Sequence, residues 1–190
     1  MIKYIKENSY VIVKMIVNQV AITMFGLMLS FATTKNDTLL LLSGILSAGM
    51  YLFLLYNMCW EEGAKDKIKV DAGRQKKEPF KALFNSLIAN ILNIILGVVI
   101  IVSDLLENTG KIAIDIFNVS SVLARFIEAM YLGIISYLEN VLIKGAIPTV
   151  MFLAIVIPAL VASHLGYTLG HRNFRILSLF GIKVKPYKSK

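Results

Sequence analysis

The sequence predicts an all-α, polytopic membrane protein: a bundle of four transmembrane helices with an extra amphipathic interfacial helix on the outer side. Three observations support this fold class. Hydrophobic residues fill 57% of the 190 positions and charged residues only 17%, whereas about a quarter of a soluble domain is usually charged. Several apolar runs reach the roughly 20 residues that a helix needs to cross a bilayer. The charges gather between these runs, in blocks that differ in sign.

Four apolar runs predict the spans. The second run ends at Tyr56 and Trp60, aromatic residues of the kind enriched at the membrane–water interface. Pro79 and Pro148 precede the third and fourth runs, and proline is favoured in the first turn of a helix. Pro158 should kink the last span, because proline removes one backbone hydrogen bond. The expected membrane domain covers residues 1–190, with spans at about 11–32, 38–59, 82–102 and 148–167.

The segment 111–140 differs from the spans because polar residues recur along it at helical spacing. At 3.6 residues per turn they fall within one arc of roughly 140°. This pattern predicts one or two amphipathic helices with a single solvated stripe, lying on the outer interface or over the bundle. A tilted fifth crossing, centred on 122–138, is the alternative. The stripe contains Lys111, Asp115, Asn118, Ser121, Arg125, Glu128, Ser136 and Asn140.

The distribution of basic residues predicts the orientation. Lysine and arginine accumulate on cytoplasmic segments, and both the loop 60–81 and the tail 171–190 are rich in them. Two segments on the same side of a membrane are joined by an even number of crossings, so 111–140 should not cross. Both termini are then cytoplasmic. The lysine- and isoleucine-rich composition is typical of bacterial multispan proteins, which indicates the plasma membrane.

Small residues at four-residue spacing predict a packing face on every span. Lipid tails are as apolar as leucine, so helices in a bilayer associate through close backbone approach and interhelical hydrogen bonds. Whether the partner of each face belongs to this chain or to another subunit stays open. The residues concerned are Gly26, Ser30, Gly44, Ala48, Asn85, Ala89, Asn93, Gly97, Ala162, Gly166 and Gly170.

Polar residues in the cytoplasmic half of the spans are the candidate binding residues. Polar groups within a bilayer usually face the bundle interior and often mark function. One hypothesis is a cavity open to the cytoplasm, with Lys14 and His164 as its ionisable members. The alternative is that Lys14 extends its ammonium group to the interface and that the asparagines only hydrogen-bond between helices. The candidates are Lys14, Asn18, Gln19, Asn90, Asn93, Ser163 and His164.

The basic tail predicts contact with anionic lipid headgroups. Apolar and aromatic residues precede the tail lysines, and each cation near such a surface contributes about 1 kcal/mol. The alternative is that these cations serve only to orient the chain. The candidate headgroup contacts are Arg172, Arg175, Lys183, Lys185 and Lys188.

The sequence offers no recognisable catalytic or metal-binding pattern. It has no paired nucleophile and base, no clustered cysteine and histidine, and no glycine-rich phosphate loop. Glu62 and Asp66 lie at the spacing of ordinary neighbours on a charged helix surface. We therefore expect no enzymatic activity, no metal and no cofactor. The net charge of +8 is explained by the cytoplasmic bias of lysine and arginine, so nucleic acid is not an expected partner.

Three functions are compatible with this pattern. The first is a non-enzymatic small subunit of a membrane transport or export assembly, which docks partner subunits through the charged loop 60–81. The second is a small-solute binding or transport protein that uses the polar cavity. The third is a homo-oligomeric channel in which Lys14 or the asparagines face a shared pore.

Overall fold

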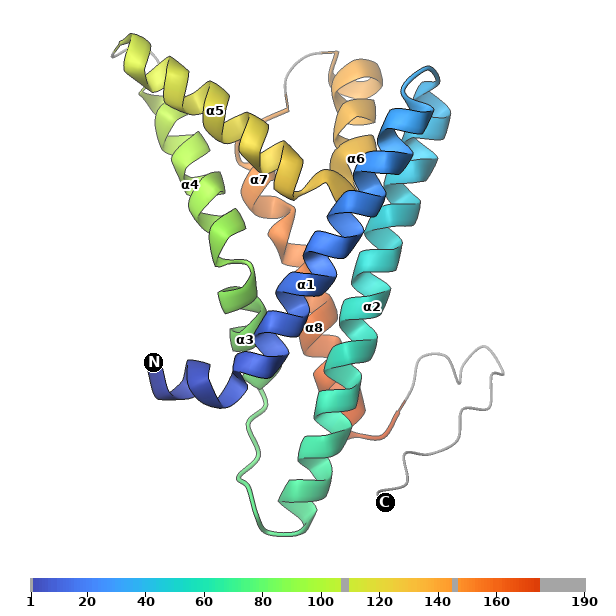
Figure 1. Ribbon diagram of the computed structural model, residues 1–190, viewed down its shortest axis with the longest axis vertical. Coiled ribbons are helices and arrows are strands. Elements are labelled where there is room, and N and C mark those ends of the chain that lie inside the picture. Colours follow the sequence, from blue (N-terminus) through green and yellow to red (C-terminus); the bar gives the residue numbers. More distant parts are fainter. Residues whose placement is uncertain (1, 107–109, 145–146, 175–190) are drawn as a thin grey trace.

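The computed structural model describes residues 2–106, 110–144 and 147–174, which are almost entirely helical and include no β-strand. The prediction of an all-α fold is therefore confirmed. The chain begins with two long antiparallel helices, α1 (Ile2–Thr33) and α2 (Asp37–Asp71), which pack side by side (Figure 1). The turn between them lies at the upper end of Figure 1, and α2 runs to the lower end.

The third expected span, 82–102, is a bent pair of helices. It comprises α3 (Lys81–Ala89) and α4 (Ile91–Leu105), and the helix bends by 59° between them. The bend is at Asn90, whose side-chain Nδ2 donates to the Ser86 carbonyl at 2.9 Å while its backbone N–H donates to the same carbonyl. An asparagine side chain that competes for helix carbonyls in this way disturbs the regular ladder.

The segment 111–143 forms a hairpin, and we use that name for it below. It consists of α5 (Lys111–Ile127), the 3-10 helix η2 (Ala129–Tyr131), α6 (Leu132–Tyr137) and the π-helical η3 (Leu138–Ile143). In Figure 1, α5 descends from the upper end to the interior, and the chain then turns and returns upward through α6. The two arms are bent by 77° at Glu128.

The structure of the hairpin contradicts the expectation that 111–140 has a single solvated stripe. Lys111 and Asp115 are exposed as expected, but Glu128 is only 2% exposed. Helical periodicity places Glu128 on the polar face only while the helix continues. Because α5 ends at Ile127, the chain direction changes and carries Glu128 into the bundle.

The last expected span consists of α7 (Met151–Ala154) and α8 (Val156–His171). They are separated by an interruption at Ile155, less than one turn before Pro158. A proline has no N–H to donate to the carbonyl four residues earlier, and its ring crowds that carbonyl. The irregularity expected from Pro158 is therefore present.

The outer surface of the bundle is apolar. Met28 and Phe31 of α1 are each 71% exposed, and soluble proteins rarely expose large continuous apolar areas. Three helices, Lys3–Thr33, Asp37–Asp71 and Met151–His171, are long and apolar enough to cross a membrane, and the two bent pairs raise the number to as many as five. This surface and these lengths are those of a multi-pass membrane protein.

The expected loop 60–81 is helical in its first half, because α2 continues to Asp71. At 1.5 Å per residue its 35 residues measure about 52 Å, which exceeds the roughly 30 Å of a bilayer core. One face of this extension packs tightly on α8: a Cβ added to Gly63 would lie 2.2 Å from the Tyr167 carbonyl oxygen, and one added to Gly170 would lie 2.1 Å from that of Trp60. The expectation of an exposed loop is therefore wrong for this stretch.

Asp66 joins three helices at the lower end of the bundle. Its carboxylate accepts hydrogen bonds from Lys81 Nζ (2.7 Å), Lys69 Nζ (3.0 Å) and the Tyr167 hydroxyl (3.1 Å). It is 1% exposed rather than an ordinary helix-surface residue. Burial by itself favours the protonated carboxyl, but the hydrogen bonds from Lys81 and Lys69 outweigh it and hold the pKa of Asp66 below its ordinary value.

Candidate functional site

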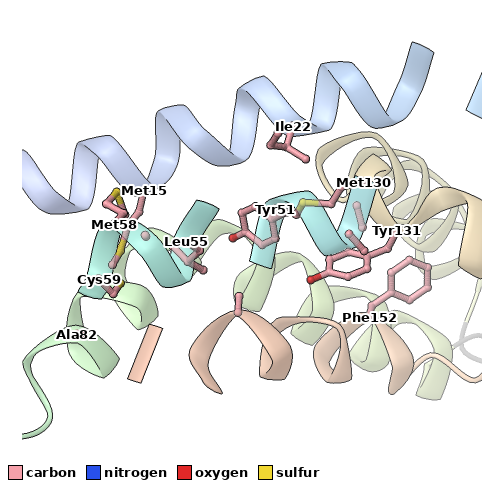
Figure 2. Close-up of a cluster of buried hydrophobic side chains, with 14 of the residues drawn as sticks. Met15, Ile22, Tyr51, Leu55, Met58, Cys59, Ala82, Met130, Tyr131 and Phe152 are labelled. Carbon is pink, nitrogen blue, oxygen red and sulfur yellow. The ribbon is translucent and has the colours of Figure 1, made fainter. Parts of the chain in front are cut away.

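The apex of the hairpin, residues 128–131, lies buried inside the bundle. Its four residues are between 0 and 7% exposed. Figure 2 shows Met130 and Tyr131 packed among Tyr51, Ile22 and other buried side chains. The apex is thus a constituent of the core.

The depth of the apex follows from its contact with α2. Ser47, which hydrogen-bonds the apex, lies ten residues along α2 from Asp37, a distance of about 15 Å at 1.5 Å per residue. The hydrocarbon core of a bilayer is about 30 Å thick. If α2 begins at one membrane surface, the apex therefore reaches the middle of the bilayer.

Two hydroxyl groups hold the apex in place. The Thr23 hydroxyl of α1 donates to the Ile127 carbonyl at 2.8 Å, and the Ser47 hydroxyl of α2 donates to the Met130 carbonyl at 2.7 Å. Both bonds reach backbone carbonyls of the hairpin, and the first satisfies the carbonyl of Ile127, the last residue of α5, where a helix leaves its final carbonyls without helical partners. They connect the apex to both long helices.

Glycines allow the close approach that these hydrogen bonds require. A Cβ added to Gly26 would lie 2.7 Å from the Met130 Cα, and one added to Gly44 would lie 2.5 Å from the Ile134 backbone nitrogen. On the hairpin side, a Cβ added to Gly133 would lie 2.2 Å from the Leu40 carbonyl oxygen. The predicted packing faces at Gly26 and Gly44 therefore have their partner within this chain.

Glu128 is buried at the apex without a counter-charge. Its Oε2 has no hydrogen-bond partner, and no cation lies within ion-pair distance of it in the described parts of the chain. Arg125, one turn earlier, instead forms a two-pronged ion pair with Glu139, with Nη1 2.9 Å from Oε2, and its guanidinium lies over the Phe152 ring. An unpaired carboxyl at membrane depth is expensive and is a functional-site candidate by default.

Two tyrosines and an asparagine accompany Glu128, and we call these four residues the central polar cluster. The Tyr51 and Tyr131 rings meet edge to face, with centroids 6.5 Å apart. Their hydroxyl oxygens point the same way along the bundle, toward Leu55 rather than Phe152 (Figure 2). Glu128 lies within electrostatic range of both hydroxyls, and the Asn90 side chain lies near the Tyr51 hydroxyl. Among the described groups, the Tyr131 hydroxyl has no hydrogen-bond partner.

The structure brings together three of the seven binding residues proposed from the sequence. Gln19 of α1 and Asn93 of α4 line one groove of about 290 Å³, which also borders the hairpin at Phe126. The Asn93 Nδ2 donates to the Asn90 Oδ1 at 3.2 Å. Gln19, Asn93 and Asn90 therefore lie in the region that borders the hairpin apex.

The other four proposed residues lie elsewhere or have different partners. Lys14 is exposed, and Asn18 is half-buried with a buried Nδ2 that lacks a partner in the described ranges. Ser163 is fully buried and donates to the Ala159 carbonyl at 2.7 Å. His164 stacks on Phe80 with 5.6 Å between ring centroids.

The proposed lipid contacts lie at the end of α8 or beyond it. Arg172 caps α8 and is exposed. The remaining four, Arg175, Lys183, Lys185 and Lys188, lie outside the described residues.

Sequence reasoning placed Glu128 in the solvated stripe and missed its burial at the apex. A signal was present, because Glu128 is the only charged residue between Arg125 and Glu139, in an otherwise apolar stretch. A charge isolated in this way is a functional-site candidate in a membrane segment. The periodicity of polar residues concealed it, since the spacing continues unchanged through the bend.

The chemistry open to the central polar cluster is the binding of a small cation. It offers one carboxyl, two phenolic hydroxyls and an amide. Across the described ranges, no three residues of the histidine, cysteine, aspartate and glutamate types are grouped to hold a metal ion. Comparisons with known protein families, with curated proteins and with solved structures gave no match.

Proposed function

We propose that this chain is a non-enzymatic membrane transport protein that moves a small cation across the bilayer, with the central polar cluster as its binding site. The observation that carries the proposal is the buried, uncompensated Glu128 at the apex of the hairpin. Irregular backbone at membrane depth is tolerated where it is buried in protein or lines a pathway. Binding sites of transporters are commonly built from discontinuous helices near the bilayer midplane.

The breaks in the two bent helix pairs support a cationic substrate. Asn90 is both the C-cap of α3 and the N-cap of α4, and Glu128 is both the C-cap of α5 and the N-cap of η2. The negative end of one helix therefore meets the positive end of the next at each break, and the two partial charges oppose each other. The full charge available at the breaks is that of the Glu128 carboxyl, which favours a cation.

The path of the chain supports four crossings with the hairpin as a re-entrant element. In Figure 1, α1 begins and α8 ends at the lower end, while both arms of the hairpin return to the upper end. With the lysine-rich extension of α2 at the lower end, the bias of basic residues assigns this end to the cytoplasm. We propose a plasma-membrane protein with both termini in the cytoplasm, whose basic tail contacts anionic lipid headgroups. Deleting residues 182–190 should then weaken binding to anionic vesicles without preventing membrane insertion.

Transport is tested with purified protein in lipid vesicles. Potassium efflux through valinomycin imposes a potential that is negative inside, and the uptake of Na⁺, methylammonium, guanidinium and protons is measured against protein-free vesicles. We expect at least one of these cations to enter faster in the presence of protein. If none of the four does, the proposed function is wrong.

A second candidate is an assembly subunit that docks partners through the extension of α2. The specific observation is that Asp66 and the contact with α8 hold this extension in place, while Arg74, Lys76 and Lys77 beyond it are exposed. Purification in mild detergent should then recover a partner in stoichiometric amount. Reversing these three charges should release it, whereas Lys35→Glu in the opposite turn should not.

The homo-oligomeric channel is the third candidate. The exposed position of Lys14 on α1 favours it, since a lysine on the outer face of a span is covered if copies of the chain associate there. Sizing of the purified protein by light scattering distinguishes a monomer from such an assembly. A Lys14→Leu variant should dissociate the assembly if this face is shared.

A further inference from the structure

The proposed cation site raises the question of which cation it binds. A bare carboxylate in an apolar interior is unstable by many kcal/mol, so it either takes up a proton or holds a cation close by. Glu128 is 2% exposed, and no arginine, lysine or histidine of the described ranges reaches it. The choice is therefore between a proton and a small metal or organic cation.

The space around Glu128 argues against an organic cation. The groove between α1, α4 and α5 is lined by Phe126 and Ile127, but Glu128, the next residue, is not among its lining residues. The carboxyl therefore does not open into this groove. A proton needs no room of its own, whereas an ammonium or guanidinium group does.

The ligands available at the apex argue against a metal cation. Alkali and alkaline-earth ions in proteins are surrounded by several oxygen ligands, usually six or more for Ca²⁺. Glu128 supplies the one carboxyl of the central polar cluster, whose other oxygens belong to two phenolic hydroxyls and an amide. In the parts of the chain that the structure describes, no three aspartate, glutamate, histidine or cysteine side chains are grouped to hold a metal ion.

The polar groups around Glu128 suit proton exchange. In the described structure, Glu128 acts electrostatically on two titratable groups, Tyr51 of α2 and Tyr131 of η2. The other elements near the apex contribute Thr23, Ser47, Asn90 and Asn93, which do not titrate in the physiological range. The Tyr131 hydroxyl, which has no other described partner, is free to exchange hydrogen bonds with water or with the carboxyl.

A row of buried polar side chains leads from the cluster to the cytoplasmic end. Asn85, Ser86, Asn90 and Asn93 are each at most 5% exposed and follow one face of α3 and the start of α4. They cover about 12 Å at 1.5 Å per residue. In the described structure, the Asn85 Oδ1 has no hydrogen-bond partner. A buried acceptor of this kind is a place where a water molecule binds.

We infer that Glu128 is a proton-binding site at the centre of the membrane, and that the proton is the cation moved by the proposed transport. This inference rests on the proposed function. The neutral carboxyl is compatible with the buried position of the apex. When the proton leaves toward Tyr51 and the polar row of α3, the charged carboxylate is destabilised until another proton arrives.

The protonation of Glu128 is tested first, by infrared spectroscopy of the full chain in lipid at neutral pH. The difference spectrum between the wild type and Glu128→Gln should contain the carbonyl band of a protonated carboxylic acid. Bands of an ionised carboxylate in its place would overturn the inference. Matching elution volume and unfolding temperature of the two proteins establish that Glu128→Gln is folded.

Proton movement is tested second, with vesicles that contain a pH-sensitive dye and carry a potential that is negative inside. Wild-type vesicles should acidify faster than protein-free vesicles. Glu128→Gln should acidify about 100-fold more slowly than the wild type, the lower end of the effect of losing a positioned proton-transfer group. Glu128→Asp, which keeps a carboxyl, should restore part of the rate. Asp115→Asn, which alters an exposed carboxylate on the same helix, should acidify like the wild type.

The outcomes separate this inference from the function on which it rests. Proton influx that depends on Glu128 supports both. Uptake of Na⁺, methylammonium or guanidinium without proton influx retains transport and overturns the proton as its cation. Absence of influx for all four cations overturns the proposed function and the inference together.

Discussion

Asp66 and Glu128 are two carboxyl groups with nearly equal burial and opposite surroundings. Asp66 is 1% exposed and Glu128 2%. Asp66 accepts hydrogen bonds from two lysines and a tyrosine, which belong to α2, α3 and α8. Glu128 has an oxygen without a partner and no described cation beside it. Burial alone therefore does not indicate what a carboxyl does.

The surroundings of the two carboxyls indicate two different roles. A buried charge whose partners come from several helices fixes the positions of those helices. Removing one partner leaves the other groups buried without a charge partner. A buried carboxyl without partners contributes little to holding the helices together, and its persistence in a membrane segment is better explained by function. We interpret the Asp66 contact as the group that fixes α2, α3 and α8 relative to one another, and Glu128 as the proposed proton-binding group of the apex.

The strongest test of this comparison is to neutralise each carboxyl with its amide. Asp66→Asn leaves Lys81, which is 12% exposed, without its charge partner, and loss of one member of a buried pair costs about 3 kcal/mol. Glu128→Gln should change the free energy of unfolding by less than about 0.5 kcal/mol, because no ion pair is lost. Thermal unfolding in detergent measures both. Equal destabilisation would abolish the distinction between the two sites.

The Asp66 contact also predicts a response to acid. Its pKa is lowered in the folded protein, once the lysine hydrogen bonds have outweighed burial. Its contribution to stability is thus complete above the unfolded-state pKa of about 3.9 and is lost as the pH falls through the lower, folded-state value. The wild type should lose stability below about pH 4, relative to Asp66→Asn. Unfolding midpoints between neutral and acidic pH test this, and parallel curves would contradict it.

The next largest effect is expected where α2 meets the hairpin. Gly44→Ala places a methyl group 2.5 Å from the Ile134 backbone nitrogen, and overpacking of this kind costs about 2 kcal/mol. Gly49 is the matched control on the same helix, because an added Cβ there meets nothing within 4 Å. Gly49→Ala should be neutral or stabilise the helix by about 0.5 kcal/mol. A larger loss for Gly49→Ala would show that the hairpin is not seated at Gly44.

Smaller losses are expected for the hydroxyls that hold the apex. Thr23→Val and Ser47→Ala each remove a side-chain hydrogen bond to a buried carbonyl, a loss of about 1 kcal/mol. Thr34→Val removes an exposed hydrogen bond to the Phe31 carbonyl and should have almost no effect. Unfolding in detergent measures the stability of all three. Faster cysteine labelling of Met130→Cys in a Cys59→Ser background would report the loosened apex.

The smallest effect separates hydrogen bonding between helices from ligand binding at Asn93. The Asn93 side chain bonds Asn90, and a polar contact between membrane helices contributes about 0.6 kcal/mol on average. If Asn93→Leu lowers stability by about this amount and leaves cation uptake unchanged, Asn93 only joins helices. Unchanged stability with reduced uptake would instead assign Asn93 to the cation pathway.

The sequence by itself determined the long helices and their membrane character. The apolar runs 11–32 and 38–59 lie within α1 and α2, and the break near Pro158 follows from the missing proline N–H. Periodicity also indicated the helical conformation of 111–140. These features depend on short-range geometry and on total hydrophobicity, which a sequence contains in full.

Only the tertiary structure decided the site. Whether Glu128 faces water or the core depends on the direction of the chain after Ile127, and that direction is set by contacts with residues about 80 to 105 positions earlier, at Thr23 and Ser47. The same holds for Asp66, whose hydroxyl partner Tyr167 is 101 positions away. Local periodicity contains no information on such distant partners. The physical reason is that a bend changes the environment of a side chain without changing the spacing of the residues around it.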